Sequence, residues 1–347
     1  MSLSDKTEYK ADLMNRVAVL GGGGWGTALA IHLGRLDREV RLWARNESLI
    51  EEIQKTRVNS TYLQGEKLPS KVVPVFSLED AVDGVSCVVC TIPSHGLREV
   101  IKKLKNSIAS DTVVVSATKG IEVESQLRMS QVIQQELGVS QAVVVLSGPS
   151  FALELARGCP TAVSVAGDNQ DIVKSVQQGL RSTYFRLYGT DDVVGVEMGG
   201  AMKNIIAIAA GTVESLDLGS NAQSALITRG LAEISRLAVA IGGRRETLSG
   251  LSGLGDLVLT CNGHLSRNRA IGLELGKGKK LEDILPTTKT VAEGIRTTAA
   301  ALKLGSEYQV ELPITFQMAE VIAGRTAPRV AVEELMLRRQ RSEHEGE

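Results

Sequence analysis

Residues 17–36, VAVLGGGGWGTALAIHLGRL, contain four consecutive glycines directly after a short apolar run. Each glycine loses more conformational entropy on folding than any other residue, so a run of them needs a backbone reason. The apolar run before the glycines is typical of a strand, and the residues after them have helical periodicity. The stretch therefore predicts a strand, a tight turn and a helix. It also indicates that another group lies very close to the main chain of the turn.

Length and composition limit what this chain can be. Its 347 residues exceed the usual size of a single domain and predict two domains. With 43% apolar and 23% charged residues, it is typical of a soluble globular protein. A net charge of −1 without a long basic run argues against nucleic acid as a partner. We find no signal peptide and no apolar stretch long enough to span a bilayer, so we expect a cytoplasmic protein without stable membrane insertion.

The cysteines and histidines show no pattern that favours a metal or a disulfide framework. The four cysteines, at positions 87, 90, 159 and 261, are few and scattered. Cys87 and Cys90 form a CxxC, but they lie in a segment typical of a buried strand, where residues three apart point to opposite faces. We interpret both as packing residues. The four histidines lack metal-ligand spacing, so no metal site is predicted.

Up to about residue 190, short apolar runs alternate with helical patterns. Most runs are nearly continuous in Val, Ile and Leu, as expected for strands covered on both faces. The alternation predicts an α/β fold, with a Rossmann-like, mainly parallel sheet flanked by helices. The predicted strands are residues 16–20, 40–43, 72–76, 86–92, 112–118, 142–148, 161–167 and 184–189.

After about Asp192 the pattern becomes all-helical, and obvious strands disappear. Helices are predicted over residues 195–216, 221–241, 267–278, 294–305 and 314–324. We therefore divide the chain into a flexible tail (1–15), a Rossmann domain (16–192), an all-α substrate domain (193–334) and a charged tail (335–347).

The glycine run fits a dinucleotide-binding fingerprint. Gly21, Gly23 and Gly26 form GxGxxG directly after the first strand and at the start of a helical pattern. The first glycine permits the turn, the second lets the backbone approach a pyrophosphate, and the third lets helix and strand pack closely. The anion then lies at the helix N-terminus. A merely flexible turn is the alternative, but the place of the run in an alternating domain favours a nucleotide site.

The end of the second predicted strand bears on the choice of nucleotide. An NAD-preferring site usually has an acidic residue there, whereas this chain has Arg45 and Asn46. Because a guanidinium can pair with a 2′-phosphate, we expect the cofactor to be NADP or NAD, with NADP accepted. The alternative is that Arg45 is a solvated surface residue.

Polar groups, from side chains and from the backbone, follow several later strands. In open parallel sheets, ligands bind outside the carboxyl ends of the strands, so these residues are expected to line one crevice. They are Thr91, Pro93, Ser94, His95, Lys119, Ser147, Gly148 and Ser150.

The helix predicted over residues 195–216 carries an unusually placed lysine. Its core stripe consists of Met202, Ile205, Ile206 and Ala209. Lys203 lies on a neighbouring face with Gly199, Gly200, Ala207 and Ala210, all tiny. The ammonium is either solvated, or it projects where a ligand or another segment approaches closely. The helix alone leaves both interpretations open.

Two polar groups occur in GLSGLGDLVLTCNGHLSRNRAIG, residues 250–272. Asp256 lies in a predicted glycine-rich turn, and residues 266–269 (SRNR) lie at a predicted helix start. A serine N-cap beside an arginine suits a phosphate group. Capping alone would explain Ser266, and surface charge would explain Arg267 or Arg269.

From about Arg16 to about Ala331, the sequence resembles bacterial NAD(P)-dependent sn-glycerol-3-phosphate dehydrogenases. The motifs that carry the resemblance are GGGGWGTALA, SATKGIE, LSGPSFALELA, GGAMKNIIAIAAG, NAQSALITRGLAEISRLA, GLSGLGDLVLTC, SRNR and VAEGIRT. The resemblance implies a two-domain enzyme that interconverts sn-glycerol 3-phosphate and dihydroxyacetone phosphate. Its product would supply the glycerophospholipid backbone.

The resemblance also implies site residues. Besides the glycines at 21, 23, 24 and 26, the implied cofactor contacts are Trp25, Arg45, Ala152, Val291 and Glu293. The implied substrate contacts are Gly148, Ser150, Asp256, Ser266 and Asn268, while Lys119 and Arg267 would face substrate and cofactor together. Lys203 matches the proton-transfer residue of the family. Some relatives have serine where this chain has Gly24, so a hydroxyl contact is absent and the backbone would bind the phosphate.

The implied chemistry is consistent with these placements. When a ketone is reduced, negative charge grows on its oxygen and a nearby acid must supply a proton. Lys203 can stabilise that charge and donate. An ordinary lysine has a pKa near 10.4, so desolvation or a neighbouring cation, Lys119 or Arg267, would help it exchange protons. Asp256 would hold the ammonium, and residues 266–268 would grip the substrate phosphate and orient it.

Two other functions are weighed against this one. A dehydrogenase of 3-hydroxy acids would share the glycine loop and a helix lysine, but it would favour a carboxylate site over the SRNR segment. A non-catalytic nucleotide sensor would have no reason to combine Lys203, Asp256 and Arg267. The small-residue helices of the second domain favour a homodimer.

Overall fold

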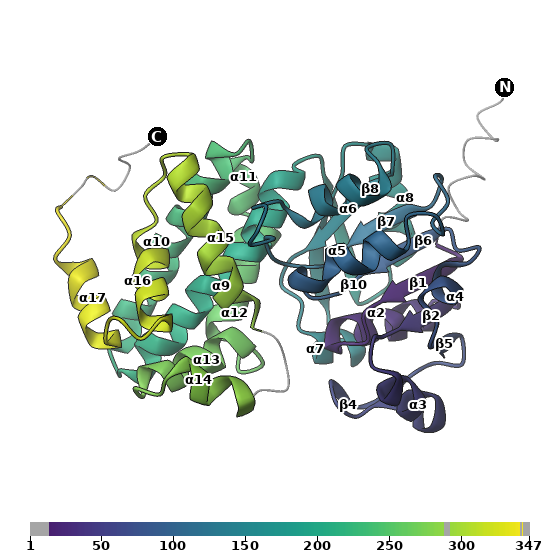
Figure 1. The fold of residues 1–347 in the computed structure, drawn as a ribbon, viewed down its shortest axis with the longest axis horizontal. Coiled ribbons are helices and arrows are strands. Elements are labelled where there is room, and N and C mark those ends of the chain that lie inside the picture. Colours follow the sequence, from purple (N-terminus) through teal and green to yellow (C-terminus); the bar gives the residue numbers. More distant parts are fainter. Residues whose placement is uncertain (1–13, 288–291, 341, 343–347) are drawn as a thin grey trace. The chain divides into compact units, whose positions relative to one another are not determined.

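The structure, a computed structural model, describes residues 14–287, 292–340 and 342, and it divides into two units (Figure 1). Unit 1 comprises Met1–Lys119 and Met129–Val193, and unit 2 comprises Gly120–Arg128 and Val194–Glu347. The segment Gly120–Arg128 therefore groups with the helical unit, whereas the sequence suggested one continuous α/β domain over residues 16–192.

Unit 1 contains a β-sheet with flanking helices, and its first strand directly precedes the glycine run. Its strands are β1 (Arg16–Leu20), β2 (Glu39–Trp43), β3 (Val58–Asn59), β4 (Leu63–Lys67), β5 (Val72–Val75), β6 (Cys87–Cys90), β7 (Val113–Ser116), β8 (Val143–Ser147), β9 (Thr161–Ala166) and β10 (Phe185–Thr190). Its helices are α2 (Gly24–Arg35), α3 (Glu47–Thr56), α4 (Leu78–Val82), α5 (Ser94–Lys103), α6 (Met129–Leu137), α7 (Ala152–Ala156) and α8 (Gln170–Leu180).

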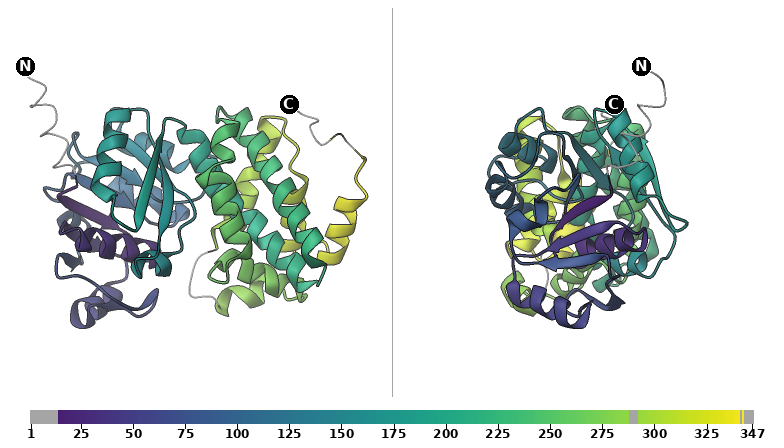
Figure 2. Two further views of the ribbon diagram at one scale, coloured as in Figure 1. Left: turned by 180° about the vertical axis from the view of Figure 1, so that it is seen from behind. Right: turned by 90° about the vertical axis from the view of Figure 1, so that its right-hand side faces the viewer.

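The sheet has eight strands in the order β10-β9-β8-β7-β6-β1-β2-β5, and Figure 2 shows it from the opposite side as well. The strands from β5 to β8 are parallel, while β9 pairs antiparallel with β8 and β10 runs parallel to β9. All eight predicted strands are present, and the mainly parallel sheet is confirmed. The order reverses at β1, whose neighbours are β2 and β6, and ligands bind at such a switch point in open sheets.

The central strands are buried on both faces, which explains their continuous apolar runs. Cys87 and Cys90 in β6 are buried free thiols, as the packing interpretation predicts. Burial raises the pKa of the Cys90 thiol to about 12, so the thiol is unreactive at neutral pH. The β3–β4 hairpin was not predicted, because β3 has two residues and β4 (LQGEK) lacks an apolar alternation.

Unit 2 is helical around one buried central helix, α9 (Val193–Ser215). The other elements are α10 (Gly219–Ala240), α11 (Arg245–Leu248), a π-helix η1 (Leu251–Gly255), α12 (Asp256–Asn262), α13 (Arg267–Gly276), α14 (Leu281–Ile284), a 3₁₀-helix η2 (Leu285–Thr287), α15 (Glu293–Glu307), α16 (Pro313–Ile322) and α17 (Pro328–Met336). Our expectation that no stretch is long and apolar enough to span a bilayer was wrong for α9. However, 89% of its most apolar window is buried inside the protein, as in the core helix of a soluble fold.

Helices α9 and α13 approach closely because each has a glycine where it meets the backbone of the other helix. A Cβ added at Gly211 would lie 2.0 Å from the carbonyl oxygen of Arg269, and one at Gly272 would lie 1.9 Å from that of Ile208. Any larger residue at either position would push the helices apart. This contact places the start of α13 against α9, where Asn268 donates to Asn204, the residue after Lys203.

A buried histidine in α2 predicts how unit 1 responds to acid. The ring of His32 hydrogen bonds to the Leu180 carbonyl at 2.7 Å and to the Tyr184 hydroxyl at 3.0 Å. Burial lowers the pKa of His32 from 6.5 to about 4. Because the unfolded chain takes up this proton first, the stabilisation is complete above pH 6.5 and is lost as the pH falls towards 4. We expect this group to contribute up to about 3 kcal/mol to the acid sensitivity of unit 1.

Denaturant unfolding followed by tryptophan fluorescence would measure this effect, since both tryptophans, Trp25 and Trp43, lie in unit 1. His32→Leu should be less stable overall, but its free energy of unfolding should depend less on pH between 4 and 6.5. The exposed His264→Gln is the control and should keep the wild-type slope. A wild-type slope in His32→Leu would contradict the assignment.

Candidate functional site

The glycine loop in unit 1 has the geometry that each fingerprint glycine requires. Gly21 has a φ of +122°, and a Cβ there would lie 2.6 Å from Thr91 Oγ1. A Cβ at Gly26 would lie 1.9 Å from the Gly21 carbonyl oxygen, so α2 and β1 pack in direct backbone contact. At Gly23, in contrast, a Cβ would meet nothing within 4 Å, which leaves that side of the main chain accessible. The open position is the one at which the fingerprint expects the pyrophosphate.

Two side chains outside the loop hold it in place. The buried Asn59 amide donates to the Gly22 carbonyl and to Thr27 Oγ1, both at 2.8 Å. Thr91 Oγ1 lies 3.0 Å from the Gly21 carbonyl oxygen, to which it donates. Neither role was predicted from the sequence. Asn59 lies 37 residues from Gly22 in a segment without a motif, and Thr91 lies 70 residues from Gly21.

Asn59→Ala should weaken cofactor binding without removing any group that would touch the cofactor. The substitution leaves the Gly22 carbonyl unsatisfied, at a cost of about 1–3 kcal/mol, and loosens the loop. We expect the Kd for NADPH, measured by quenching of tryptophan fluorescence, to rise about tenfold. Asn169→Ala is the matched control, because it removes the cap of α8 in the same unit, where the Asn169 side chain accepts from the Asp171 and Ile172 N–H groups rather than from the loop. An unchanged Kd in Asn59→Ala would contradict the role.

Several predicted residues meet at the ends of β7 and β8. Lys119 Nζ donates to the Gly148 carbonyl at 3.0 Å, and Ser150 Oγ donates to the same oxygen at 2.9 Å. Gly148 has a φ of +146°, which favours glycine. Of the other strand-end residues, Ser94 begins α5 and Ser147 ends β8.

The remaining predicted cofactor residues of unit 1 lie beside the loop or at the surface. Gly24 begins α2, and a Cβ there would lie 3.5 Å from the Cβ of Ala152, the first residue of α7. Trp25 is half-buried against the core of unit 1. Arg45 is exposed after β2, directly before the Asn46 cap of α3.

In unit 2, a buried polar cluster forms around Lys203. Its ammonium group donates to Asp256 Oδ1 and, at 2.8 Å, to Thr260 Oγ1. Lys203 and Asp256 are 7% and 0% exposed, so the charge pair is almost completely removed from water. Thr260 in turn donates to the Asp256 carbonyl at 2.6 Å. The interpretation of Lys203 as a solvated surface lysine is therefore wrong, and another segment does approach it closely.

The approaching segment is η1, followed by α12. A Cβ at Gly199, one turn before Lys203, would lie 2.4 Å from the Ser252 carbonyl oxygen. A Cβ at Gly253 would lie 2.0 Å from the Leu248 carbonyl oxygen. Asp256 is the first residue of α12 rather than part of a glycine-rich turn, because packing on α9 outweighs the low helix propensity of the glycines. Single π-helical turns such as η1 are rare, and they often occur at functional sites.

The start of α13 adjoins this cluster. Asn268 donates to Asn204 Oδ1 at 2.9 Å and accepts from the Gly294 N–H at 3.1 Å, so it links α9, α13 and α15. The predicted helix start is confirmed, and Ser266 Oγ caps it by accepting from the Arg269 N–H.

The two arginines of SRNR differ in their surroundings. Arg269 forms an ion pair with Glu214 of α9, whereas Arg267 is exposed at the first position of α13. Glu293 begins α15 and is half-buried, while Val291 lies outside the described residues. Within residues 14–287, 292–340 and 342, there is no group of three His, Cys, Asp or Glu side chains that could hold a metal ion.

The chain matches one protein family in both halves. Residues 16–173 match the NAD-dependent glycerol-3-phosphate dehydrogenase N-terminus, and residues 192–333 match the C-terminus of the same family. The chain belongs to the NAD-dependent glycerol-3-phosphate dehydrogenase family. The resemblance found in the sequence is thus confirmed.

Individual members of the glycerol-3-phosphate dehydrogenase family are similar over almost their whole length. A protein of Koribacter versatilis named glycerol-3-phosphate dehydrogenase [NAD(P)+] is 48% identical over 94% of this chain and 98% of its own. The enzyme of the same name from Acidobacterium capsulatum is 48% identical over 95% of this chain and 100% of its own. The crystal structure of glycerol-3-phosphate dehydrogenase from Coxiella burnetii is 40% identical, with a TM-score of 0.91 over 94% of this chain and 100% of its own.

Two polar residues of the unit 2 cluster were missed in the sequence. Thr260 lies one turn after Asp256, and Asn204 directly follows Lys203 in α9. The spacing of Asp256 and Thr260 would have placed both on one face if α12 had been predicted. The contact between Asn204 and Asn268 depends on the glycine-mediated packing of α9 and α13, which no local pattern indicates.

Proposed function

We propose that this protein is an NAD(P)-dependent oxidoreductase that interconverts sn-glycerol 3-phosphate and dihydroxyacetone phosphate. The observation that carries the proposal is a buried Lys203–Asp256 pair in a chain whose two halves both match the glycerol-3-phosphate dehydrogenase family. In the direction of ketone reduction, the product is a precursor of glycerophospholipids.

The glycine loop fits the pyrophosphate of a dinucleotide. Gly23 offers backbone without steric obstruction, and α2 begins at Gly24, so its positive end and N–H groups favour an anion. When bound, the nicotinamide ring exchanges a hydride with the substrate carbon. Trp25, Arg45, Ala152, Glu293 and Val291 are proposed to surround the cofactor, with Lys119 and Arg267 facing both cofactor and substrate.

Lys203 is proposed as the group that moves the proton. Its ammonium stabilises the negative charge that develops on the carbonyl oxygen and then donates a proton to it, and in the reverse direction the neutral amine accepts the hydroxyl proton. Asp256 and Thr260 fix the position of Nζ through their hydrogen bonds.

The start of α13 is proposed as the site of the substrate phosphate. The helix presents its positive end there, and Arg267 adds an exposed guanidinium suited to a phosphate. Asn268 and Ser266 are buried and hydrogen bonded, so they hold this segment rigidly. Gly148 and Ser150 complete the proposed substrate contacts from unit 1.

The test is the oxidation of NADPH and NADH with dihydroxyacetone phosphate as substrate, compared with 3-keto acids. The proposal expects turnover with dihydroxyacetone phosphate and at least 100-fold lower kcat/KM with the keto acids, which lack the phosphate. Preference for a keto acid would support a 3-hydroxy-acid dehydrogenase. Nucleotide binding without turnover of any substrate would support a sensor.

Arg45 is proposed to favour NADP through its 2′-phosphate. Arg45→Asp should lower kcat/KM with NADPH by about 10–100-fold, because an attractive charge contact becomes repulsive. The kcat/KM with NADH should change much less. The steady-state ratio of the two cofactors measures this effect. Lys55→Asp, an exposed change of the same charge on α3, is the control and should leave the ratio unchanged. An unchanged ratio in Arg45→Asp would end the idea.

We also propose a cytoplasmic location and a homodimer. A partly exposed face of α10, which includes Ala225 and Val239, offers small and apolar side chains to a second copy. Sedimentation at micromolar concentration distinguishes a dimer from a monomer.

A further inference from the structure

The segment Gly120–Arg128 connects β7 with α6 of unit 1, yet it belongs to unit 2. Ile121 is 1% exposed and packs in the hydrophobic core of unit 2. The segment folds back on itself, since Ile121 pairs antiparallel with Arg128 and the Glu122 N–H donates to the Leu127 carbonyl at 3.0 Å. We call residues 120–128 the crossing segment.

A buried ion pair fixes the end of the crossing segment on the central helix. The Arg128 guanidinium donates to Glu197 of α9, and the two side chains are 15% and 3% exposed. A buried ion pair contributes little net stability, because removing two charges from water offsets their attraction. Such a pair does define one geometry, since each charge is costly to bury without the other. The pair is therefore better suited to fixing a position than to adding stability.

The place at which the ion pair holds the crossing segment on α9 bears on the proposed reaction. Glu197 precedes Lys203 by six residues on α9, about 9 Å along the helix axis. Lys119 directly precedes the crossing segment, so its Cα lies within about 7 Å of the Cα of Ile121. The Lys119 side chain is held by the Gly148 carbonyl of unit 1. The main chain after Lys119 is thus anchored on unit 2, while its side chain is anchored on unit 1.

We propose that Arg128 and Glu197 are positioning residues for the oxidoreductase reaction. By holding the crossing segment on α9, they fix where the main chain that directly follows Lys119 attaches to the helix that carries Lys203. The inference rests on the proposed function, which assigns Lys119 and Lys203 to the site. It predicts that the pair affects the use of the substrate much more than the binding of the cofactor, because most of the proposed cofactor contacts, the glycine loop, Arg45 and Ala152, lie within unit 1.

The test compares Arg128→Met, Glu197→Gln, the double variant and the conservative Arg128→Lys. For the single variants we expect KM for dihydroxyacetone phosphate to rise about tenfold and kcat to fall about tenfold. The Kd for NADPH, from tryptophan fluorescence, should stay within about twofold. The double variant should be no worse than the worse single variant, because the two residues act as one unit. Arg128→Lys should recover part of the loss, and hydrogen exchange of residues 120–128 should be faster in Arg128→Met.

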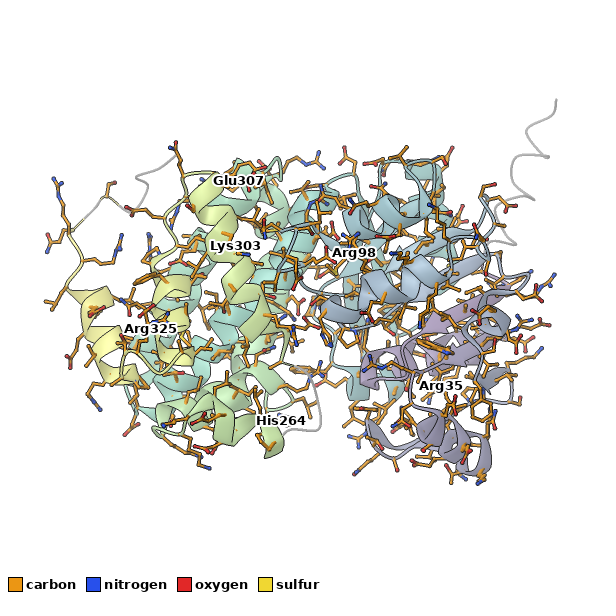
Figure 3. The ribbon with its side chains drawn as sticks, viewed as in Figure 1. Arg35, Arg98, His264, Lys303, Glu307 and Arg325 are labelled. Carbon is orange, nitrogen blue, oxygen red and sulfur yellow. The ribbon has the colours of Figure 1, made fainter. Side chains whose placement is uncertain are left out.

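Two controls separate positioning from general stability. Arg98→Met removes another ion pair, with Glu136, and should lower the melting temperature without changing KM. Lys303→Met removes the bond from α15 to the Val123 carbonyl (3.2 Å), and its exposed lysine is labelled in Figure 3. This second control should loosen the crossing segment only slightly.

The outcomes are distinguishable. Wild-type KM and kcat in Glu197→Gln, whatever its melting temperature, would overturn the positioning role and leave the proposed function intact. If Arg128→Met fails to fold, Glu197→Gln and Arg128→Lys still decide the question, since they keep the shape or the charge. A wild-type protein without activity towards dihydroxyacetone phosphate would overturn both proposals.

Discussion

Replacing Lys203 with alanine is expected to lower kcat for dihydroxyacetone phosphate by about 10³-fold, while the Kd for NADPH stays within about twofold. General acid catalysis contributes about 10²–10⁴-fold, and alanine removes the proposed proton donor outright. Lys203 is not among the proposed cofactor contacts, and the glycine loop lies in unit 1, so binding of the cofactor should be spared. Single-turnover kinetics and fluorescence titration measure the two quantities separately.

Lys277→Ala is the control for Lys203→Ala. Lys277 is an exposed lysine of unit 2, paired with Glu274 at the end of α13, and its loss should leave kcat unchanged. A reduction of only two- or threefold in Lys203→Ala would remove Lys203 from the mechanism. Added alkylamines offer a second check, since partial recovery of turnover in Lys203→Ala would show that a missing amine limits the rate.

Asp256→Ala is expected to destabilise unit 2 by about 3–5 kcal/mol, because it leaves the buried Lys203 ammonium without its counter-charge. The double variant Lys203→Met/Asp256→Ala should recover much of that loss, since neither charge then remains. Turnover should nevertheless stay as low as in Lys203→Ala. Unfolding followed by far-ultraviolet circular dichroism detects the helices of both units, whereas tryptophan fluorescence detects unit 1 alone. A change in the first signal without a change in the second therefore reports on unit 2.

The comparison of single and double variants separates charge pairing from packing. If the double variant were less stable than Asp256→Ala by the cost of a further cavity, the aspartate would contribute mainly by filling space. Full activity in Asp256→Ala would show that Thr260 alone can hold the amine, which would contradict the role proposed for the carboxylate.

The sequence predicts most of unit 1 because its signals are local. Continuous apolar runs identify all eight strands of the large sheet, and the spacing of Gly21, Gly23 and Gly26 identifies the loop. The β3–β4 hairpin has too few apolar residues to be recognised, although it contributes Asn59 to the loop. A supporting residue of this kind is visible only once the chain is folded.

In unit 2, tertiary packing decides what local patterns cannot. Helix α12 was not predicted because glycines precede it, and α17 because its nine residues, which begin with Pro328, show no clear apolar stripe. The pairing of Lys203 with Asp256, expected from the chemistry, is present in the fold. The distinction between Arg267 and Arg269 needed the structure, because the ion pair between Arg269 and Glu214 depends on how α13 lies on α9.

The close backbone contacts at Gly199 and Gly253 have a consequence for how this protein tolerates mutation. Neither glycine has a functional group, yet Gly199 sets the distance between α9 and η1, and Gly253 sets the distance between η1 and the end of α11. An alanine at Gly199 would push η1, and α12 after it, away from α9, whereas an alanine at Gly253 would shift η1 against α11. Either change would move the Asp256 carboxylate relative to the Lys203 amine. In a saturation mutagenesis library, these two glycine positions should therefore be as intolerant of substitution as Lys203 itself. The sequence around the Lys203–Asp256 pair should be constrained by the size of the side chains as much as by their reactivity.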